Sequence, residues 1–139
     1  MKELKASAEI KVRFSEVDSM NIVWHGNYVK YFEDARIAFG EKYNIGYLDM
    51  FAQGFYAPIV KMDFKFVNPL IFGDTFIAEA VYKPCEGAKL MFDYNIRRKS
   101  DNELVATGST TQVFLDLKYK LVLYSPEFYI NWKKKYVIE

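Results

Sequence analysis

The chain has 139 residues, of which 51% are hydrophobic and 27% charged, and its net charge at pH 7 is +1. This length suits one domain, and the near-neutral charge excludes nucleic acid as a main partner, because non-specific binding to phosphates needs a strong positive field. No apolar run approaches the roughly 20 residues of a membrane span. The first residues lack the apolar stretch of a signal peptide, and the single cysteine, Cys85, has no intrachain disulfide partner. We therefore expect a cytoplasmic protein.

The first predicted element is a strand over residues 4–14, where apolar and polar side chains alternate. Between residues 28 and 41 the apolar side chains recur at intervals of three and four instead, and the charged ones fall largely on the opposite side. This spacing predicts a long amphipathic helix.

The alternation of apolar and polar side chains returns over residues 60–66, 76–82 and 90–96, which predicts three more strands. A fifth strand is predicted over residues 104–115, where the pattern does not establish which side is buried. The turn residues between these segments favour an antiparallel meander. Near the end, Ser125 is a good N-cap, Pro126 suits the first helical position and Glu127 the first turn, so we expect a short helix to about Lys135.

These elements predict an α+β fold, in which an antiparallel five-stranded sheet curls around one long central helix and a short C-terminal helix closes the domain. Aromatic residues make up 18% of the chain, more than one small core readily buries. An open sheet also leaves an edge strand unpaired, so we expect self-association.

Several kinds of catalytic site are not supported. A Ser-His-Asp hydrolase requires a histidine base, but the only histidine is His25 and no G-x-S-x-G motif is present. Cys85 lies in a predicted turn without a neighbouring histidine, and one histidine and one cysteine do not form a common zinc site. The glycines are scattered, so phosphate-binding loops are absent. We expect no metal and no cofactor.

The remaining candidate is a turn bearing Asp18 that leads into the helix beginning near His25-Gly26-Asn27. A carboxylate can attack an electrophilic carbon or direct water onto it, and the unpaired N–H groups that open a helix can stabilise an oxyanion. Acids before helices are also common turn or capping residues, and a lone histidine is often structural. Local chemistry leaves both interpretations open.

The segment Arg13–Arg36 resembles the hot-dog-fold acyl-CoA thioesterases of the 4-hydroxybenzoyl-CoA thioesterase family. The motifs V-x-x-x-D-x-x-x-x-V-x-x-x-N-Y and Y/F-F-E-x-A-R correspond here to Asp18, Val23, Asn27-Tyr28 and the run from Tyr31 to Arg36. The strand order and the Asn68-Pro69 turn also resemble that family. The resemblance implies a single hot-dog thioesterase-like domain over residues 1–139.

By this resemblance, Asp18 is the nucleophile or general base, the backbone amides of His25 and Gly26 polarise the carbonyl oxygen, and the His25 side chain is a candidate catalytic helper. The segment Ser19-Met20-Asn21 departs from the glycine-containing turn of many relatives, although Asn21 tolerates a left-handed backbone. This departure leaves the substrate undetermined.

Relatives bind the acyl group between subunits, which makes a set of apolar and polar residues candidates for substrate binding, with core packing as the alternative for the apolar ones. They are Met20, Asn27, Tyr28, Phe32, Met50, Phe51, Phe55 and Tyr56. Basic residues available to the nucleotide phosphates, or simply solvated, are Lys61, Lys65, Arg97, Arg98 and Lys99.

The sequence therefore predicts a homodimeric or homotetrameric thioesterase that cleaves acyl-CoA to a carboxylic acid and free thiol. Three alternatives stay open. They are a thioesterase that acts on an acyl-carrier protein, a non-catalytic module that binds acyl-CoA or fatty acid, and an interaction protein without a ligand.

Overall fold

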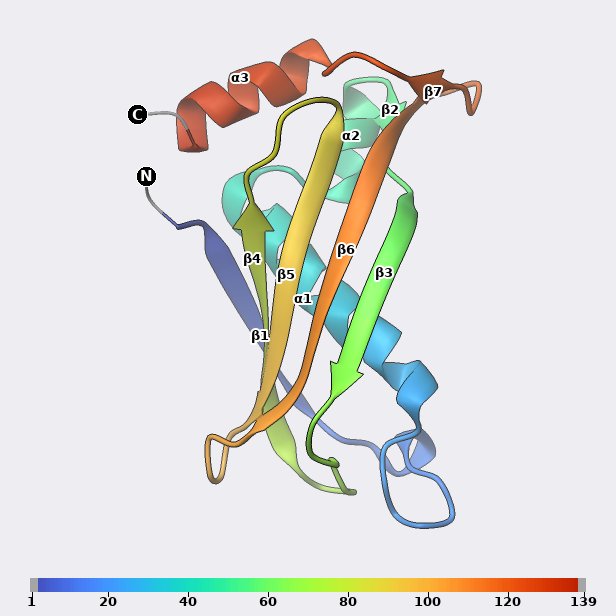
Figure 1. The fold of residues 1–139 in the computed structure, drawn as a ribbon, viewed down its shortest axis with the longest axis vertical. Coiled ribbons are helices and arrows are strands. Elements are labelled where there is room, and N and C mark those ends of the chain that lie inside the picture. Colours follow the sequence, from blue (N-terminus) through green and yellow to red (C-terminus); the bar gives the residue numbers. More distant parts are fainter. Residues whose placement is uncertain (1–2, 138–139) are drawn as a thin grey trace.

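A long helix lies across the concave face of a curled antiparallel sheet in the computed structural model, which describes residues 3–137 (Figure 1). The helix is α1 (Tyr28–Tyr43). The five longer strands are β1 (Lys5–Lys11), β3 (Ile59–Phe66), β4 (Thr75–Lys83), β5 (Lys89–Arg98) and β6 (Leu104–Asp116). The shorter elements are α2 (Tyr47–Ala52), β2 (Phe55–Tyr56), β7 (Leu121–Val122) and α3 (Glu127–Tyr136). The predicted α+β, hot-dog architecture is confirmed.

The order of the strands departs from the predicted meander at one place. Strands β4, β5 and β6 follow one another as predicted, and β1 pairs with β4. Strand β3 does not lie beside β4 but pairs with β6 at the opposite edge, with Phe64 opposite Gly108. The prediction was wrong here because alternation reports which face of a strand is buried and not which strand is its neighbour.

The first strand is shorter than predicted, because the chain turns after Lys11. Residues Phe14–Glu16 form a single 3-10 turn in which Glu16 Oε1 accepts the N–H of Arg13 at 2.8 Å. Phe14 is 75% exposed and packs edge-on against Phe72, with ring centroids 5.7 Å apart. Its apolar character therefore continued the alternating pattern without continuing the strand.

Helix α1 matches its prediction, and it ends where Asn44 takes a left-handed conformation (φ 58°) and donates its N–H to Gly40. The start of α3 differs from its prediction. Ser125 does not cap the helix, because its hydroxyl donates to the carbonyl of Gly87 at 2.9 Å, and the residue that flanks the helix is Pro126. Ser125 thereby ties the start of α3 to the β4–β5 turn.

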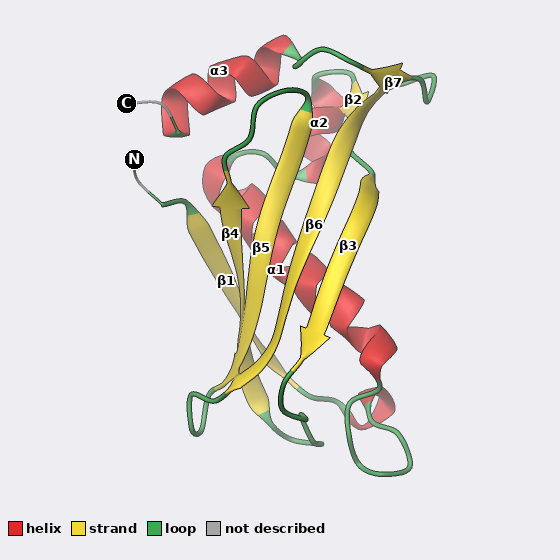
Figure 2. Cartoon of the chain, viewed as in Figure 1, coloured by secondary structure: helices red, strands yellow, loops and turns green. Residues whose placement is uncertain are grey.

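Helix α3 lies above the C-terminal end of α1 (Figure 2), and aromatic side chains of the core pack at this end. Phe39 is fully buried and contacts Phe92 edge-on, with ring centroids 4.8 Å apart. Trp132 of α3 donates its indole N–H to the carbonyl of Tyr43 at 2.8 Å, and the Tyr129 hydroxyl bonds the carbonyl of Lys89 at 2.7 Å. Helix α3 therefore completes the core.

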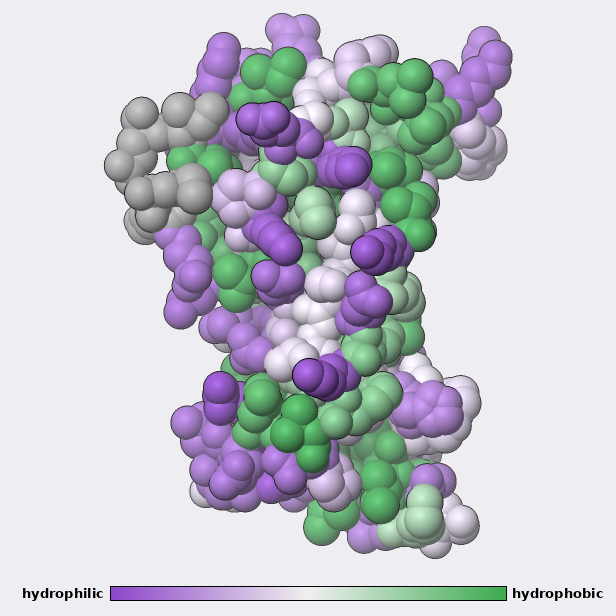
Figure 3. Space-filling view, viewed as in Figure 1, coloured by the Kyte–Doolittle hydropathy of each residue, from purple (hydrophilic) through white to green (hydrophobic). Residues whose placement is uncertain are grey.

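The edge strand β3 is largely exposed and partly apolar. Val60 is 61%, Met62 42% and Phe66 51% exposed. Figure 3 shows apolar residues gathered along this side of the molecule, over β3 and toward β7, whereas polar residues are interspersed across the sheet. Within residues 3–137, no helix has the length and apolar character needed to span a membrane.

Candidate active site

Asp18 closes its own turn with one of its two carboxylate oxygens. Its Oδ1 atom accepts the backbone N–H groups of Met20 at 2.8 Å and Ile22 at 3.4 Å. Asn21 takes the left-handed conformation (φ 61°), as the sequence allowed. The other oxygen, Oδ2, accepts no hydrogen bond from the described residues 3–137. The turn role therefore leaves one oxygen available for chemistry.

A 3-10 turn, η2 (His25–Asn27), opens α1. The N–H of Asn27 donates to the carbonyl of Trp24 at 2.9 Å, and the N–H of Tyr28 donates to the carbonyl of His25. The N–H groups of His25 and Gly26 have no acceptor in the part of the chain that the structure describes. These two amides lie at the positive end of a 16-residue helix, where a developing negative charge is stabilised.

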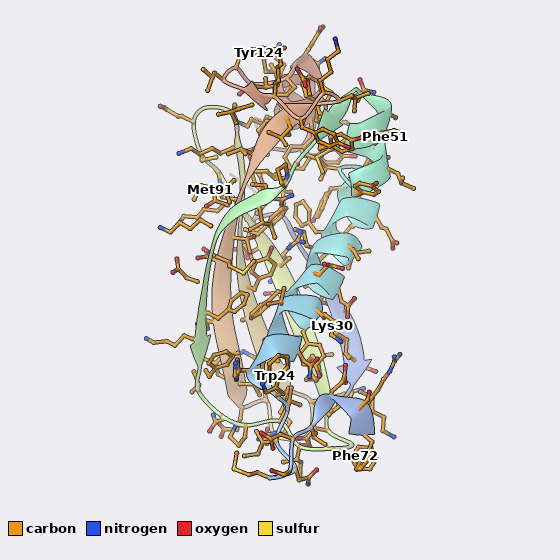
Figure 4. All side chains as sticks on the ribbon, turned by 90° about the vertical axis from the view of Figure 1, so that its right-hand side faces the viewer. Trp24, Lys30, Phe51, Phe72, Met91 and Tyr124 are labelled. Carbon is orange, nitrogen blue, oxygen red and sulfur yellow. The ribbon has the colours of Figure 1, made fainter. Side chains whose placement is uncertain are left out.

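Trp24 covers the backbone of this turn. Its ring lies 5.0 Å from the His25 ring, centroid to centroid, and a Cβ at Gly26 would come within 2.0 Å of the Trp24 ring. Only glycine fits beneath the indole in this arrangement. Figure 4 shows Trp24 at the start of α1, at the same end of the molecule as Phe72.

A surface cleft of about 320 Å³ brings Asp18, His25 and Tyr28 together. The remaining lining residues come from the Asp18 turn, from the end of β3 and from the segment that follows it, and they are Ile22, Val23, Phe66, Val67, Asn68 and Pro69. The volume is in the range of small-molecule sites. The cleft thus joins a carboxylate, an imidazole and the opening of a helix.

The loop after β3 is fixed against the Asp18 turn from both sides. The N–H of Val23 donates to the carbonyl of Leu70 at 2.9 Å, and the Asn68 side chain donates to the carbonyl of Leu104 at 2.7 Å. Arg98 donates to the carbonyl of Pro69 and forms ion pairs with Asp74 at 3.4 Å and Asp101 at 2.8 Å. Its guanidinium therefore holds the wall of the cleft.

Tyr28 places its ring in the wall of the cleft and is only 3% exposed. Burial raises the pKa of its hydroxyl to about 12, although the positive charge of Arg98 acts in the opposite direction. The phenol therefore stays protonated and neutral at physiological pH.

Several predicted substrate residues lie near the cleft without lining it. Asn27 is buried and donates its side-chain N–H to the carbonyl of Glu16 at 2.9 Å. Phe32 is 1% exposed and packs between Phe64 and Tyr94, with both centroid distances 4.9 Å. Met20 is 70% exposed at the tip of the Asp18 turn.

Other predicted residues lie on different parts of the single chain. Phe51 lies toward the opposite end of α1 (Figure 4). Tyr56 packs against Phe51 with centroids 5.8 Å apart and stacks on Tyr119 with centroids 5.3 Å apart. The remaining members of the predicted set are Met50 in α2, Phe55 in β2, Lys61 and Lys65 exposed on β3, Arg97, which bonds the carbonyl of Asn102, and Lys99, which pairs with Glu9. The structure thus brings together Asp18, His25 and Tyr28 but not the whole set.

The sequence did not identify the far wall of the cleft. Phe66 was predicted as the last residue of a strand, Val67 had no assigned role, and Asn68-Pro69 indicated a turn. The position of this segment depends on β3 lying at the sheet edge, which no local pattern encodes. No group of three or more His, Cys, Asp or Glu side chains within residues 3–137 is placed to hold a metal ion.

Comparisons with known proteins identify the family to which the chain belongs. The model of the Thioesterase-like superfamily matches residues 12–132. A Bacillus subtilis (strain 168) protein named "Putative acyl-CoA thioesterase YneP" is 30% identical over 108 residues, which is 78% of each chain. The Arabidopsis thaliana protein "Acyl-acyl carrier protein thioesterase ATL3, chloroplastic" is 30% identical over 114 residues, 82% of this chain and 60% of that protein.

A solved structure shows the same fold. The DHNA-CoA thioesterase from Staphylococcus aureus superposes with a TM-score of 0.82 at 24% sequence identity, covering 94% of this chain and 90% of that one. The resemblance drawn from the motifs around Asp18 is therefore confirmed at the level of family and fold.

Proposed function

Because the chain belongs to the Thioesterase-like superfamily and is a thioester hydrolase, we propose that it cleaves acyl-CoA to a carboxylic acid and CoA thiol, with Asp18 as the catalytic carboxylate. One observation carries this proposal. The cleft holds a carboxylate with one oxygen fixed and the other without a hydrogen bond among residues 3–137, next to a helix opening with two N–H groups that likewise have no acceptor among these residues.

The proposed reaction begins with the thioester carbonyl oxygen directed at the amides of His25 and Gly26. Either Oδ2 of Asp18 attacks the carbonyl carbon, or Asp18 takes a proton from a water that attacks it. The carbonyl π electrons move onto oxygen, where the two N–H groups stabilise the negative charge. The electron pair on the oxyanion then re-forms the carbon–oxygen double bond while the carbon–sulfur bond breaks and its electron pair leaves with sulfur. The sulfur takes the proton that Asp18 removed from water or, in the direct route, a proton from solvent. In the direct route, water hydrolyses the resulting anhydride.

His25 is proposed as a helper. Its imidazole lines the same cleft and is exposed, so it can exchange protons with solvent and with the sulfur leaving group. His25 also contributes its backbone amide, which a side-chain substitution retains. Tyr28 is proposed to contact the acyl group, since its ring forms the buried wall of the cleft.

We further propose that the protein is a homo-oligomer assembled through the exposed edge strand β3. Among the described strands, β3 pairs only with β6, so its outer edge offers backbone groups beside the exposed side chains of Val60, Met62 and Phe66. Because Phe66 also lines the cleft, a second subunit at this edge would form one side of the site. Lys61 and Lys65 on β3 would then lie beside the subunit interface, and they are the proposed contacts to the phosphates of CoA.

We also propose a cytoplasmic location, which the single, unbridged cysteine Cys85 supports.

A second candidate substrate is an acyl group held on an acyl-carrier protein. The similarity to the Arabidopsis carrier-protein thioesterase favours it, and the chemistry at the thioester is the same. Hydrolysis of acyl-carrier protein in preference to the matching acyl-CoA would support this candidate.

The test is thiol release from a panel of acyl-CoAs by wild type and by Asp18→Asn. Asparagine keeps an Oδ1 acceptor for the N–H of Met20, so the turn is retained while the carboxylate charge is lost. We expect kcat to fall at least about 100-fold with little change in melting temperature.

Ser19→Ala, a substitution at the exposed neighbouring residue, is the control and should retain wild-type kcat. Wild-type kcat in Asp18→Asn would reject the catalytic role of Asp18. Saturable binding of acyl-CoA without turnover by the wild type would indicate a binding module instead.

A further inference from the structure

The carbonyl oxygen of Glu16 is the point at which the Asp18 turn meets the start of α1. It accepts the backbone N–H of Trp24 at 2.9 Å and the side-chain N–H of Asn27, also at 2.9 Å. Since a carbonyl accepts hydrogen bonds and does not donate them, the amide orientation of Asn27 is fixed, with Nδ2 toward Glu16. Two donors from the helix opening therefore meet one oxygen of the segment that carries the carboxylate.

These two donors lie on either side of the amides proposed to stabilise the oxyanion. Trp24 comes directly before His25 and Gly26, and Asn27 comes directly after them. Both flanks of this dipeptide are thereby held at the same oxygen, while its own N–H groups have no acceptor among residues 3–137. Only the Asn27 bond comes from a side chain, so it is the one that a substitution can remove.

The Asp18 carboxylate is fixed relative to the same oxygen from the other side. Asp18 follows Glu16 by two residues. Between them, Val17 pairs with Val23 in an antiparallel bridge. The N–H of Asp18 donates to the carbonyl of Ile22 at 2.8 Å, which closes the turn. The carboxylate and the two amides thus share one reference point, the Glu16 carbonyl.

Asn27 is placed for this bond and not for contact with a substrate. It is 9% exposed and is not among the described residues that line the cleft, whereas its neighbour Tyr28 and the nearby His25 do line it. A hydrogen bond in the low-dielectric interior is stronger electrostatically than one in water. The buried Asn27 bond is therefore suited to holding the start of α1 in place.

We propose that Asn27 is a positioning residue, whose bond to the Glu16 carbonyl sets the separation between the Asp18 carboxylate and the two amides. This inference rests on the proposed acyl thioesterase function and adds a residue that acts without touching the substrate. Thioester cleavage needs the carboxylate at the carbonyl carbon and the amides at the carbonyl oxygen at the same time. A displacement of about 1 Å between such groups can lower a rate about 100-fold.

The first experiment is steady-state hydrolysis of the acyl-CoA that the wild type cleaves fastest in the panel above. Asn27→Leu keeps the branched shape of the side chain but removes the donor, and the Glu16 carbonyl keeps the N–H of Trp24 as a partner. We expect kcat to fall about 10- to 100-fold while KM changes less than about threefold. Asn131→Leu, the same substitution at an exposed residue of α3, is the control and should keep wild-type kcat and KM.

A double variant separates positioning from a general loss of structure. When the carboxylate charge is already lost in Asp18→Asn, its separation from the amides matters little. Adding Asn27→Leu should then lower the residual kcat by less than about threefold. A purely structural role of Asn27 would lower kcat by the same factor in both backgrounds.

A measurement without turnover tests the link itself. The N–H of Asn27 donates to the carbonyl of Trp24, and the N–H of Tyr28 donates to the carbonyl of His25, so both amides are protected while η2 is closed. We expect Asn27→Leu to lower their protection against hydrogen exchange about tenfold, with the protection of β5 and β6 unchanged. Asn27→Ala also removes the donor and serves for the same measurements if Asn27→Leu does not fold.

Unchanged kcat with a raised KM would overturn the proposal, since it would indicate a substrate contact. So would an equal loss of kcat in both backgrounds, or unchanged protection of η2. Hydrolysis by the wild type that Asn27→Leu leaves unchanged rejects the positioning role alone. No hydrolysis by the wild type, combined with lower protection of η2 in Asn27→Leu, rejects the acyl-CoA thioesterase and retains the link between Asn27 and Glu16.

Discussion

The two ends of α1 are held by different kinds of interaction. At the C-terminal end, Phe39 and Trp132 belong to a continuous aromatic cluster, in which the indole N–H of Trp132 and the hydroxyl of Tyr129 donate to backbone carbonyls. At the N-terminal end, backbone hydrogen bonds and turns fix the chain, while Trp24 and His25 stay exposed. Packing determines stability at one end, and unpaired donors and acceptors are available for chemistry at the other.

This separation has a physical reason. Burying apolar surface is the main favourable contribution to folding, but it requires that buried polar atoms form hydrogen bonds within the protein. A reacting centre needs the opposite condition, because Oδ2 of Asp18 and the amides of His25 and Gly26 must be free to meet a substrate. Substitutions at the two ends should therefore separate stability from activity.

The largest expected effect is on stability, from Phe39→Ala. Phe39 is fully buried among Tyr82, Phe92 and Trp132, so removing its ring leaves a cavity in the core. We expect the free energy of unfolding to fall by about 3–5 kcal/mol in denaturant titrations, with kcat per folded molecule unchanged. Phe14→Ala, at an exposed ring, is the control and should cost less than about 0.5 kcal/mol.

If Phe39→Ala lowered kcat by more than the fraction of protein that is unfolded, stability and activity would not depend on different ends of α1.

The next expected effect is on activity, from Gly26→Ala. The new Cβ would lie 2.0 Å from the Trp24 ring, so the ring or the η2 backbone must shift. We expect kcat for thioester hydrolysis to fall by up to about 100-fold, since misplacing catalytic amides by about 1 Å has effects of that size. The melting temperature should change little, because Trp24 is half exposed.

The control for this prediction is the same substitution in a Trp24→Ala background. There the clash is absent, so Gly26→Ala should have little further effect on kcat. An equal loss of kcat in both backgrounds would show that the indole is not the cause.

The smallest expected effect is the dependence of stability on alkaline pH. Burial raises the pKa of Tyr28 from 10.0 to about 12, so the unfolded chain ionises this phenol at lower pH than the folded chain does. The unfolded state then binds fewer protons, and stability falls as pH rises from 10 to 12. Tyr28→Phe should flatten the decline in denaturant titrations across this range.

The aromatic cluster at the C-terminal end of α1 supplies a comparison for this titration, because burial also raises the pKa of Tyr129. Tyr129→Phe should flatten the same decline while leaving kcat unchanged. If neither substitution changes the pH dependence, these buried phenols do not determine alkaline stability.

Much of the site was predictable because it is local in sequence. The Asp18 turn, the left-handed Asn21 and the start of α1 depend on residues within about ten positions of one another, and short-range hydrogen bonds fix them. The failure at Phe14 shows the limit of such patterns, since a residue can fit the alternation and still lie outside the strand.

The sequence by itself determined the identity of the helix and the long strands, the Asp18 turn and, through its motifs, the family. Only the tertiary structure decided that β3 lies at the edge beside β6 and that residues 66–69 form the far wall of the cleft. Local periodicity fixes which side of a strand is buried, whereas strand neighbours and cavities arise from contacts between residues far apart in the chain.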